Sequence, residues 1–473
     1  MTRQSGVLLP VFSIPGPYGC GVFGDDARAW IDLLAKSGFS LWQVLPFGIT
    51  DGYNSPYMSF SSFGGNPFFI DPEALYRQGL VTKDELAAQQ FADPYLCHYD
   101  ELRKNRIPFL KRAAARVTDR APIEQFLTEN PRLAGASRFF AAKEANGGRA
   151  WQEWTEEPSP DDLFAWQFIQ YGFHRQWQEI HLYAKEKGIS ILGDLPFYVS
   201  LDSYDVWSDP KQFQLEEDFR PSCVAGVPPD YFSEEGQMWG NPLYDWEYME
   251  QDGFSFWKER LGYMLTLFDG VRIDHFRGIG SYWSIPADAP SAKSGEWKEG
   301  PGEKLIDAFN AVAGDKMILA EDLGIIDDTT RELLTYSGYP GMAVFQFGFD
   351  GDPLSTHLPH NYRENLAAYT GTHDNNTLLG FWWEADENTR RLAMDYLGDP
   401  KDACNATIRA LLMSRAETVI FPMQDLLGYG ADTRINTPGK AEGNWQYRLS
   451  KEQMNSLDSA YWAHLNRMYA RSK

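Results

Sequence analysis

Apolar runs and helical stretches alternate along nearly the whole chain, and this alternation restricts the possible folds more than any other feature. Eight short runs fit buried strands, and helical periodicity separates most of them. The runs cover residues 6–14, 39–47, 190–199, 270–276, 317–324, 341–349, 367–374 and 418–428. Parallel strands joined by right-handed helical crossovers produce such an order. The sequence therefore predicts a (β/α)8 TIM barrel, with a doubly wound open sheet as the alternative.

Helices are predicted between the runs by apolar spacing, acidic starts and glycine stops. They begin at Asp25, at about residue 162, around 254, near Leu305 and at Asp327 or Asp328, and a closing helix is expected near 450–470. The residues after Tyr447 leave no room for a C-terminal β-sandwich domain.

Two connections, residues 48–160 and 200–253, are far too long for ordinary loops. The first contains charged helical patterns, and the second is rich in Pro, Trp and Tyr. Both leave from predicted strand C-termini, which form the face where barrel active sites lie. We therefore predict one catalytic barrel domain over residues 1–473. It carries a mostly helical insertion subdomain at 48–160 and a substrate-covering insertion at 200–253.

Charge and cysteine content narrow the choice of partners. The chain has 43 Lys and Arg against 66 Asp and Glu, a net charge of −23, which argues against nucleic acids and anionic membranes as partners. The four cysteines show no C-x-x-C spacing, so neither a zinc site nor a disulfide framework is indicated. No apolar run reaches membrane-spanning length and no signal peptide is evident, so a cytoplasmic location is expected.

One strand end, 270-GVRIDHFRG-278, is unusually polar for a buried strand. Side chains alternate across a strand, so Arg272 and Asp274 point to the same face while Ile273 and His275 point to the other. A charged strand end that reaches solvent is one explanation. A cleft that needs these charges is the other.

Acidic residues recur at the ends of other runs, which favours the cleft. Carboxylates at or near the C-terminal ends of four predicted strands converge on one barrel rim: Asp194, Asp274, Glu321 and Asp374. Clustered carboxylates repel one another unless a metal, a cationic partner or a catalytic task offsets the cost. A divalent metal site is one alternative. However, Arg272, His275 and His373 supply positive charge among the acids, so we predict no metal.

The same acids suit retaining glycoside chemistry, in which a nucleophile and a proton donor lie about 5–5.5 Å apart. Arg272 would keep Asp274 ionised as the nucleophile. Glu321, from the next strand, is one carbon longer than an aspartate and could reach the leaving oxygen. Asp374 could hydrogen-bond the sugar hydroxyls as positive charge develops on the ring.

Three motifs in chain order resemble the α-amylase clan: 271-VRIDHFRG-278, 320-AEDLG-324 and 371-GTHDN-375. Within that clan the chain resembles the 4-α-glucanotransferase family, glycoside hydrolase family 77. Further stretches agree with it: 54-NSPY-57, 64-GGNP-67, 193-GDLPFYV-199, 226-GVPPDYFSEEGQMWGNPLYDW-246 and 443-GNW-445. The resemblance extends from residue 5 to about 448. One departure is Asn376, where the family's third motif often has an acid.

The resemblance implies roles for individual residues. Asp274 would be the nucleophile, Glu321 the general acid/base and Asp374 the transition-state stabiliser. The implied substrate-binding residues are Ser55, Tyr57, Asp194, Asp230, Tyr231, Phe232, Trp239, Arg272, His275, Phe347, His373 and Asn444. Of these, Tyr57 and Phe347 could instead be packing aromatics, Trp239 loop core, and Asp194 a residue that pins a loop.

The implied function is retaining transfer of α-1,4-glucan segments between maltooligosaccharides through a covalent glucosyl-enzyme intermediate. Glucose would serve as an acceptor, no cofactor would be needed, and the protein would be a monomer or a weak homo-oligomer. The alternatives are an α-1,4-glucan hydrolase and a non-catalytic glucan-binding protein on a decayed barrel. An isomerase with a phosphate ligand is disfavoured, because no Gly-rich phosphate loop follows the last two runs.

Overall fold

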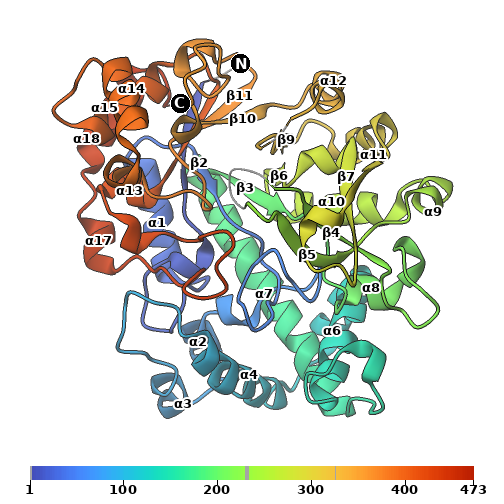
Figure 1. Cartoon of the computed structure of the whole chain (residues 1–473). Helices are drawn as coiled ribbons and strands as arrows, with labels where there is room; N and C mark the ends of the chain where they lie inside the picture. The colour runs from blue at the N-terminus through green and yellow to red at the C-terminus, as the bar shows by residue number, and fades with distance from the viewer. Residues whose placement is uncertain (1–2, 230–233, 325, 473) are drawn as a thin grey trace.

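The structure is a computed structural model that describes residues 3–229, 234–324 and 326–472. Within these residues an eight-stranded parallel sheet forms the centre of the molecule (Figure 1). Its strands, in spatial order, are β10 (Gly341–Val344), β11 (Leu366–Tyr369), β12 (Thr418–Pro422), β1 (Gln4–Leu8), β2 (Leu41–Gln43), β3 (Ser190–Leu195), β6 (Gly270–Ile273) and β9 (Met317–Ala320). The Ala320 N–H donates to the Pro340 carbonyl, just before β10, at 2.9 Å. This bond closes the sheet, and the predicted barrel is confirmed.

All eight strands overlap the predicted apolar runs but are shorter than the runs. Proline explains three of the early ends, because it has no N–H to donate to a neighbouring strand. Pro10, Pro46 and Pro196 each lie within a predicted run and beyond the end of the observed strand. The residues that follow these strands therefore leave the barrel and form its C-terminal rim.

Helices surround the sheet (Figure 1). They are α1 (Asp25–Lys36), α2 (Pro72–Arg77), α3 (Lys83–Ala87), α4 (Tyr99–Ala115), α5 (Ala121–Glu129), α6 (Pro131–Ala145), α7 (Pro160–Glu186), α8 (Tyr204–Ser208), α9 (Trp246–Gln251), α10 (Ser255–Leu267), α11 (Glu303–Ala313), α12 (Asp328–Ser337), α13 (Leu378–Glu384), α14 (Glu387–Leu397), α15 (Ala403–Met413), α16 (Met423–Leu427), α17 (Lys451–Asn455) and α18 (Ser459–Met468). Among the described helices, none is long and apolar enough to cross a membrane.

The sequence signals of α1 show why these helices form. Its buried side chains recur at helical spacing: Ala27, Trp30, Ile31 and Leu34. Asp25 and Asp26 in its first turn and Lys36 in its last turn complement the helix dipole. Gly38, with φ of 76°, adopts the left-handed conformation that follows many helix ends.

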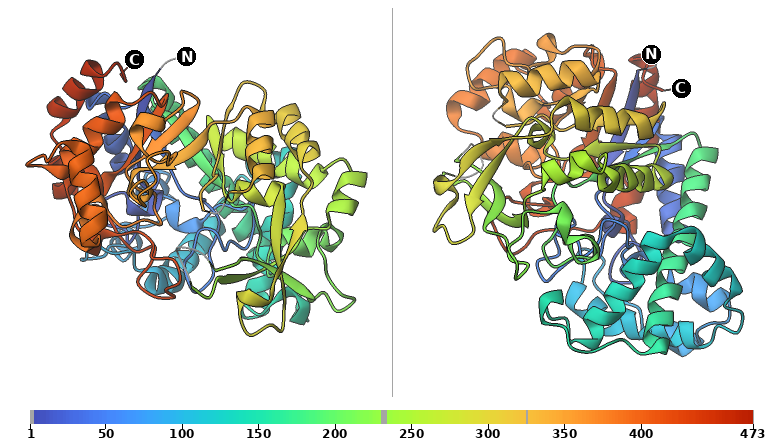
Figure 2. Two further views of the ribbon diagram at one scale, coloured as in Figure 1. Left: turned by 45° about the horizontal axis from the view of Figure 1, so that its top comes forward. Right: turned by 90° about the vertical axis from the view of Figure 1, so that its right-hand side faces the viewer.

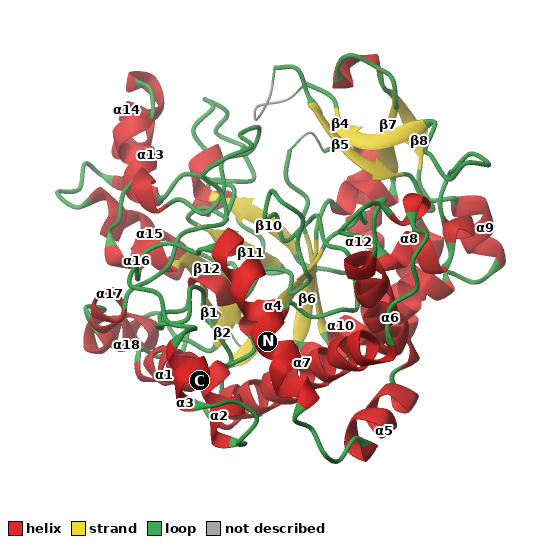
Figure 3. Ribbon diagram, turned by 90° about the horizontal axis from the view of Figure 1, so that it is seen from below, coloured by secondary structure: helices red, strands yellow, loops and turns green. Residues whose placement is uncertain are grey.

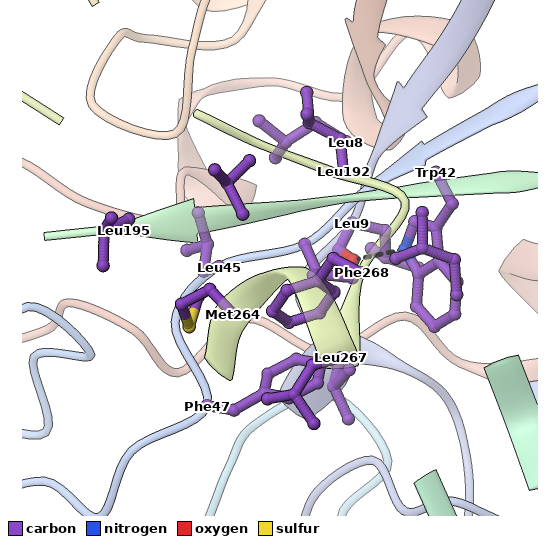
Figure 4. Close-up of a cluster of buried hydrophobic side chains, with 14 of the residues drawn as sticks. Leu8, Leu9, Trp42, Leu45, Phe47, Leu192, Leu195, Met264, Leu267 and Phe268 are labelled. Atoms are coloured by element: carbon purple, nitrogen blue, oxygen red, sulfur yellow. Dashed lines mark hydrogen bonds between the residues drawn. The ribbon is translucent and has the colours of Figure 1, made fainter. Parts of the chain in front are cut away.

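Buried hydrophobic side chains, among them Phe47 and Phe268, pack together beside β3 (Figure 4). The ring of Phe47 lies 4.7 Å from that of Trp177 on α7 and 5.0 Å from that of Phe268, both edge to face. Gly193 in β3 makes room for Phe268, because a Cβ at this position would lie 2.2 Å from its Cδ2 atom. This packing holds the end of β3, and with it Asp194, in a fixed position.

A second, antiparallel sheet lies apart from the barrel (Figure 3). Its strands, in spatial order, are β5 (Gln237–Pro242), β4 (Cys223–Val227), β7 (Ser281–Pro286) and β8 (Glu296–Glu299). The sequence analysis anticipated neither this sheet nor the contribution of residues 281–299. The reason is that β4 pairs with β7 across a long stretch of chain, and β8 is exposed along its whole length and lacks an apolar face.

The helices α2 to α6, which lie between β2 and α7, gather on one side of the molecule (Figure 2, right view, blue to teal). α6 and α7 pack against each other, and so do α4 and α7. The division of the chain into one barrel domain and two insertion subdomains stays a prediction.

The single closing helix predicted near 450–470 is wrong, because this segment forms two helices. Ser450 caps α17 in a capping box with Gln453. Asp458 then begins α18 by accepting the Tyr461 N–H. Two successive capping side chains thus divide the segment.

The C-terminal segment is held to the barrel by a buried arginine. Arg471 donates to carbonyl oxygens at the end of α15, in the turn before β12 and in β1, at 2.8–3.3 Å: Leu411, Leu412, Ser414, Ala416, Glu417 and Gln4. Burial lowers the pKa of its guanidinium to about 9. The side chain stays charged at neutral pH and binds the two ends of the chain together.

We expect Arg471→Ala to lower the free energy of unfolding by about 2–4 kcal/mol, because it leaves several buried carbonyls without a donor. Arg415→Ala is the control: the Arg415 side chain is 72% exposed and pairs with an exposed Glu364. Its change should stay below about 0.5 kcal/mol. Urea unfolding followed by circular dichroism measures both changes. Equal values for the two variants would contradict this account of Arg471.

Candidate active site

The barrel brings the four predicted acids to one rim. Asp194 lies in β3, where it is paired in register with Arg272 of β6. Asp274 and Glu321 are the first residues after β6 and β9, and Asp374 lies in the loop after β11. Parallel strands end on the same edge of a barrel, so their terminal side chains meet.

Arg272 joins two of these acids. Its Nη1 lies 2.7 Å from both carboxylate oxygens of Asp194, and its Nη2 donates to Asp274 Oδ1 at 2.8 Å. The Arg272 side chain is 4% exposed and that of Asp194 is fully buried. The alternative of a charged strand end that reaches solvent is therefore wrong. The guanidinium is buried between two carboxylates.

Glu321 has a different environment from the two acids bound to Arg272. The Glu321 carboxylate accepts the backbone N–H of His275 at 2.8 Å and that of Leu323 at 2.9 Å. Burial of the carboxyl raises its pKa to about 8; nearby Asp274 adds to this rise, and Arg272 opposes it. At neutral pH Glu321 keeps its proton.

The pKa of Asp374 is shifted in the opposite direction, below its ordinary value. Its Oδ2 lies 3.2 Å from His373 Nε2, and its Oδ1 accepts a hydrogen bond from Asn436 Nδ2 at 2.6 Å. Burial alone would raise its pKa. His373, Asn436 and Arg272 outweigh that effect and hold the pKa at about 2. Asp374 is ionised wherever the protein is folded near neutral pH.

Tyr57 packs against His373. The Tyr57 ring stacks on the His373 ring, with centroids 5.3 Å apart and planes at 13°. The Tyr57 hydroxyl donates to Asp194 Oδ2 at 2.7 Å. Tyr57 thus links the segment that leaves β2 to both Asp194 and His373.

These side chains surround a cavity of about 590 Å³. Ten of the predicted site residues line it: Ser55, Tyr57, Trp239, Arg272, Asp274, His275, Glu321, Phe347, Asp374 and Asn444. Asp194 and His373 lie behind this lining and contact it through Arg272, Tyr57 and Asp374. Asp230, Tyr231 and Phe232 lie outside the described residues. The structure therefore collects the described members of the predicted set in one place.

His275 has an unusual backbone conformation at the cavity wall. Its φ is 48°, in the left-handed region that a non-glycine residue rarely adopts. Burial lowers the pKa of its imidazole to about 4, so the ring is neutral. Its Nε2 is buried without a hydrogen-bond partner in the described part of the chain. The Trp239 ring packs edge to face against the His275 ring, with centroids 5.2 Å apart. A ligand hydroxyl in the cavity could satisfy this nitrogen.

Several functional positions were not identified from the sequence. Asn436 and Arg434, which contact Asp374, lie in 434-RINTPGK-440, where the only signal was a Pro-Gly turn. Trp445 lines the cavity and lies 5.8 Å from the His373 ring, within the GNW motif that pointed only to Asn444. Contacts of this kind join loops that are distant in the chain, and no local pattern reports them.

Asn376, the departure from the family motif, does not line the cavity. Its Nδ2 donates to Glu384 on α13 at 2.7 Å. An amide in place of an acid at this position therefore puts a hydrogen bond where two carboxylates would repel each other. Within the described residues, no cluster of three or more His, Cys, Asp or Glu side chains has the geometry to hold a metal ion.

Comparisons with known proteins agree along the whole chain. A family model described as 4-alpha-glucanotransferase matches residues 9–454. The 4-alpha-glucanotransferase of Synechocystis sp. is 40% identical in an alignment that covers 99% of this chain and 98% of the relative. That of Thermus thermophilus is 40% identical, with 95% of each chain covered.

Solved structures show the same similarity. The amylomaltase of Streptococcus agalactiae, solved in complex with acarbose, superposes with a TM-score of 0.96 at 36% identity and covers all of both chains. The amylomaltase of Corynebacterium glutamicum has a TM-score of 0.82 at 17% identity, with 100% of this chain and 75% of the other covered. At that identity the second match shows the fold alone.

We expect Glu321 to lose its proton with a midpoint near pH 8. The infrared difference between the parent protein and Glu321→Gln should contain the C=O band of a protonated carboxyl at pH 6, and this band should be absent at pH 10. Because the folded-state pKa lies above the ordinary value of 4.5, the folded state binds more protons than the unfolded state between these two values. Stability of the parent relative to the variant should therefore fall as pH rises from about 4.5 to 8. A midpoint near 4.5 would contradict this environment for Glu321.

Proposed function

The chain belongs to the 4-alpha-glucanotransferase family, glycoside hydrolase family 77, which transfers α-1,4-glucan segments between maltooligosaccharides, and we propose that it does so by a retaining double displacement. The observation that carries the mechanism is that three neighbouring carboxylates have different partners, and that two of them, Glu321 and Asp374, differ in protonation state. Asp274 is bound to a guanidinium, Glu321 keeps its proton at neutral pH, and Asp374 is ionised.

In the first step Asp274 attacks the anomeric carbon of the donor glucan while Glu321 gives its proton to the leaving glycosidic oxygen. The C–O bond to the leaving segment breaks and an ester bond to Asp274 forms. Retaining enzymes work in this way, with one carboxylate as nucleophile and the other as acid. Oδ1 of Asp274 accepts a hydrogen bond from Arg272. We therefore assign Oδ2 as the oxygen that attacks the anomeric carbon.

In the second step Glu321, now ionised, takes a proton from the acceptor hydroxyl. That oxygen attacks the anomeric carbon, the ester bond breaks, and Asp274 is regenerated. Positive charge develops on the sugar ring in both steps. The ionised Asp374, close to the ring hydroxyls, would stabilise this charge most strongly in the transition state.

Transfer requires that a sugar hydroxyl, rather than the far more abundant water, reaches the intermediate. Acceptor binding and exclusion of water decide this competition. The cavity wall supports sugar binding, because aromatic side chains from separate segments form part of it: Tyr53, Tyr57, Tyr198, Trp239, Trp297 and Trp445. Flat apolar ring faces suit the faces of glucosyl units.

The donor and acceptor are assigned from the chemistry of the cavity and from its similarity to a relative of known structure. The acarbose complex of the Streptococcus agalactiae relative supports oligosaccharides as ligands of the cavity. We propose maltooligosaccharides as donors and acceptors, with glucose as the smallest acceptor. A cytoplasmic location and a monomeric or weakly associated state belong to the same proposal.

The function is tested with maltotriose as the sole substrate. We expect longer maltooligosaccharides together with free glucose, separated by chromatography. Asp274→Asn should reduce the rate by at least about 10³-fold, since it removes the nucleophile. Glucose and maltose without longer products would mean hydrolysis, and no turnover by the parent protein would contradict the proposed function.

A substrate whose leaving group needs no proton distinguishes the role of Glu321 from that of Asp274. Glu321→Gln should slow maltotriose transfer by about 10²–10⁴-fold, because the leaving oxygen needs a proton. Fluoride leaves without one, so this variant should still release fluoride from α-maltosyl fluoride in a first turnover. The maltosyl group should then remain on Asp274, where mass spectrometry of the intact protein detects it. The double variant with Asp274→Asn is the control and should show no added mass.

A further inference from the structure

Both carboxylate oxygens of Asp374 have a polar partner in the protein. His373, its neighbour in sequence, lies against Oδ2, and Asn436 donates to Oδ1. Asn436 comes from the loop after α16, far from Asp374 in sequence, and it also lines the cavity. The orientation of the carboxylate is therefore set by two segments of the chain at once.

The backbone of Asn436 is itself fixed to the Asp374 loop. Its N–H donates to the His373 carbonyl at 3.1 Å, and its own carbonyl accepts from Arg434 Nε at 2.6 Å. Arg434 Nη2 donates to the Asp374 carbonyl at 2.5 Å. These three bonds and the side-chain amide join residues 434–436 and 373–374 into one unit.

The rest of the loop is held closed by Asn444. Its Oδ1 accepts the Thr437 N–H at 2.8 Å, and its Nδ2 donates to the Lys440 carbonyl at 2.8 Å. The segment between them lies at the cavity wall. The loop is thus supported independently of the Asn436 side chain, so changing that side chain removes one contact and not the whole loop.

We propose that Asn436 is a positioning residue that fixes the Asp374 carboxylate for transition-state stabilisation, an inference that rests on the proposed role of Asp374. A carboxylate with one free oxygen can rotate about its χ2 bond, and its lone pairs then point away from the sugar hydroxyls for part of the time. An amide donor on Oδ1 stops this rotation. Preorganised acceptors are most valuable where charge develops during the reaction.

The position of Asn436 predicts which kinetic constant changes. Interactions that strengthen only in the transition state affect kcat, whereas those already made with bound substrate affect KM. Asn436 acts on Asp374, whose hydrogen bonds to the sugar strengthen as positive charge develops. Its loss should therefore lower kcat and leave KM nearly unchanged.

The first experiment compares Asn436→Ala with the parent in maltotriose disproportionation. We expect kcat to fall about 10- to 100-fold, the usual effect of one hydrogen bond to a charged group, with KM within about 3-fold. Asn365→Ala is the matched control: Asn365 is exposed and lies at the opposite end of β11. Its side-chain amide donates a hydrogen bond to the Gly338 carbonyl. It should retain the parent's kcat and KM.

Asn436→Asp provides a readout that a purely structural role would not produce. The replacement keeps the size of the side chain but puts a second carboxylate against Oδ1. At neutral pH the two repel each other; at lower pH they share one proton, and an O–H donor to Asp374 is restored. The kcat of this variant relative to the parent should therefore rise as pH falls from 7 to 5. The other groups that face Asp374 are unchanged in both proteins: His373, Arg272, Arg434 and Tyr57.

An unchanged kcat in Asn436→Ala, or an increase confined to KM, would overturn the inference. A pH profile of Asn436→Asp parallel to that of the parent would overturn it as well, and this variant decides the question if Asn436→Ala does not fold by circular dichroism. Failure of the parent protein to form longer maltooligosaccharides would instead contradict the proposed function. An active parent with unaffected Asn436 variants would contradict only the role of Asn436.

Discussion

The buried Arg272 guanidinium between Asp194 and Asp274 is the interaction on which the rest of the site depends. An isolated buried charge is costly, and removing one member of such a cluster typically costs about 3–5 kcal/mol. The fully buried Asp194 offsets the charge of Arg272 from within the barrel. Asp274 lines the cavity with this guanidinium beside its Oδ1. Tyr57, bonded to Asp194, brings the segment after β2 into the same network.

Glu321 and Asp374, two carboxylates of nearly the same intrinsic acidity, differ in protonation state because their surroundings differ. Glu321 accepts neutral backbone N–H groups from His275 and Leu323, and burial keeps it protonated at neutral pH. Asp374 has a histidine and an amide on its two oxygens and stays ionised. Acid and base functions in one site require such a separation of pKa values. In this protein the separation arises from the burial of Glu321 and from the hydrogen-bond partners of Asp374 in the rim loops.

The structures added to the barrel shape the cavity rather than the chemistry. The antiparallel sheet formed by β5, β4, β7 and β8 brings Trp239 and Trp297 to the cavity wall, and the segment after β2 contributes Tyr53 and Tyr57. These elements follow strand C-termini, the face on which barrel enzymes vary in function. The strand ends and the loop after β11 supply the acids, and the longer connections supply aromatic surface at the cavity wall.

The sequence by itself determined the barrel and the acids that we propose as catalytic, because strand burial leaves a local record in apolar runs and because Asp274, Glu321 and Asp374 lie within continuous motifs at strand ends. Tertiary structure alone decided the second sheet, the two closing helices and the contacts of Asn436 and Arg434 with Asp374. Some of these features depend on contacts between segments that are distant in the chain, and the two closing helices depend on single capping side chains. Neither kind of interaction leaves a periodic pattern in the sequence. The protonation states of Glu321 and Asp374 were also decided by tertiary structure, since burial and hydrogen-bond partners exist only once the chain is folded.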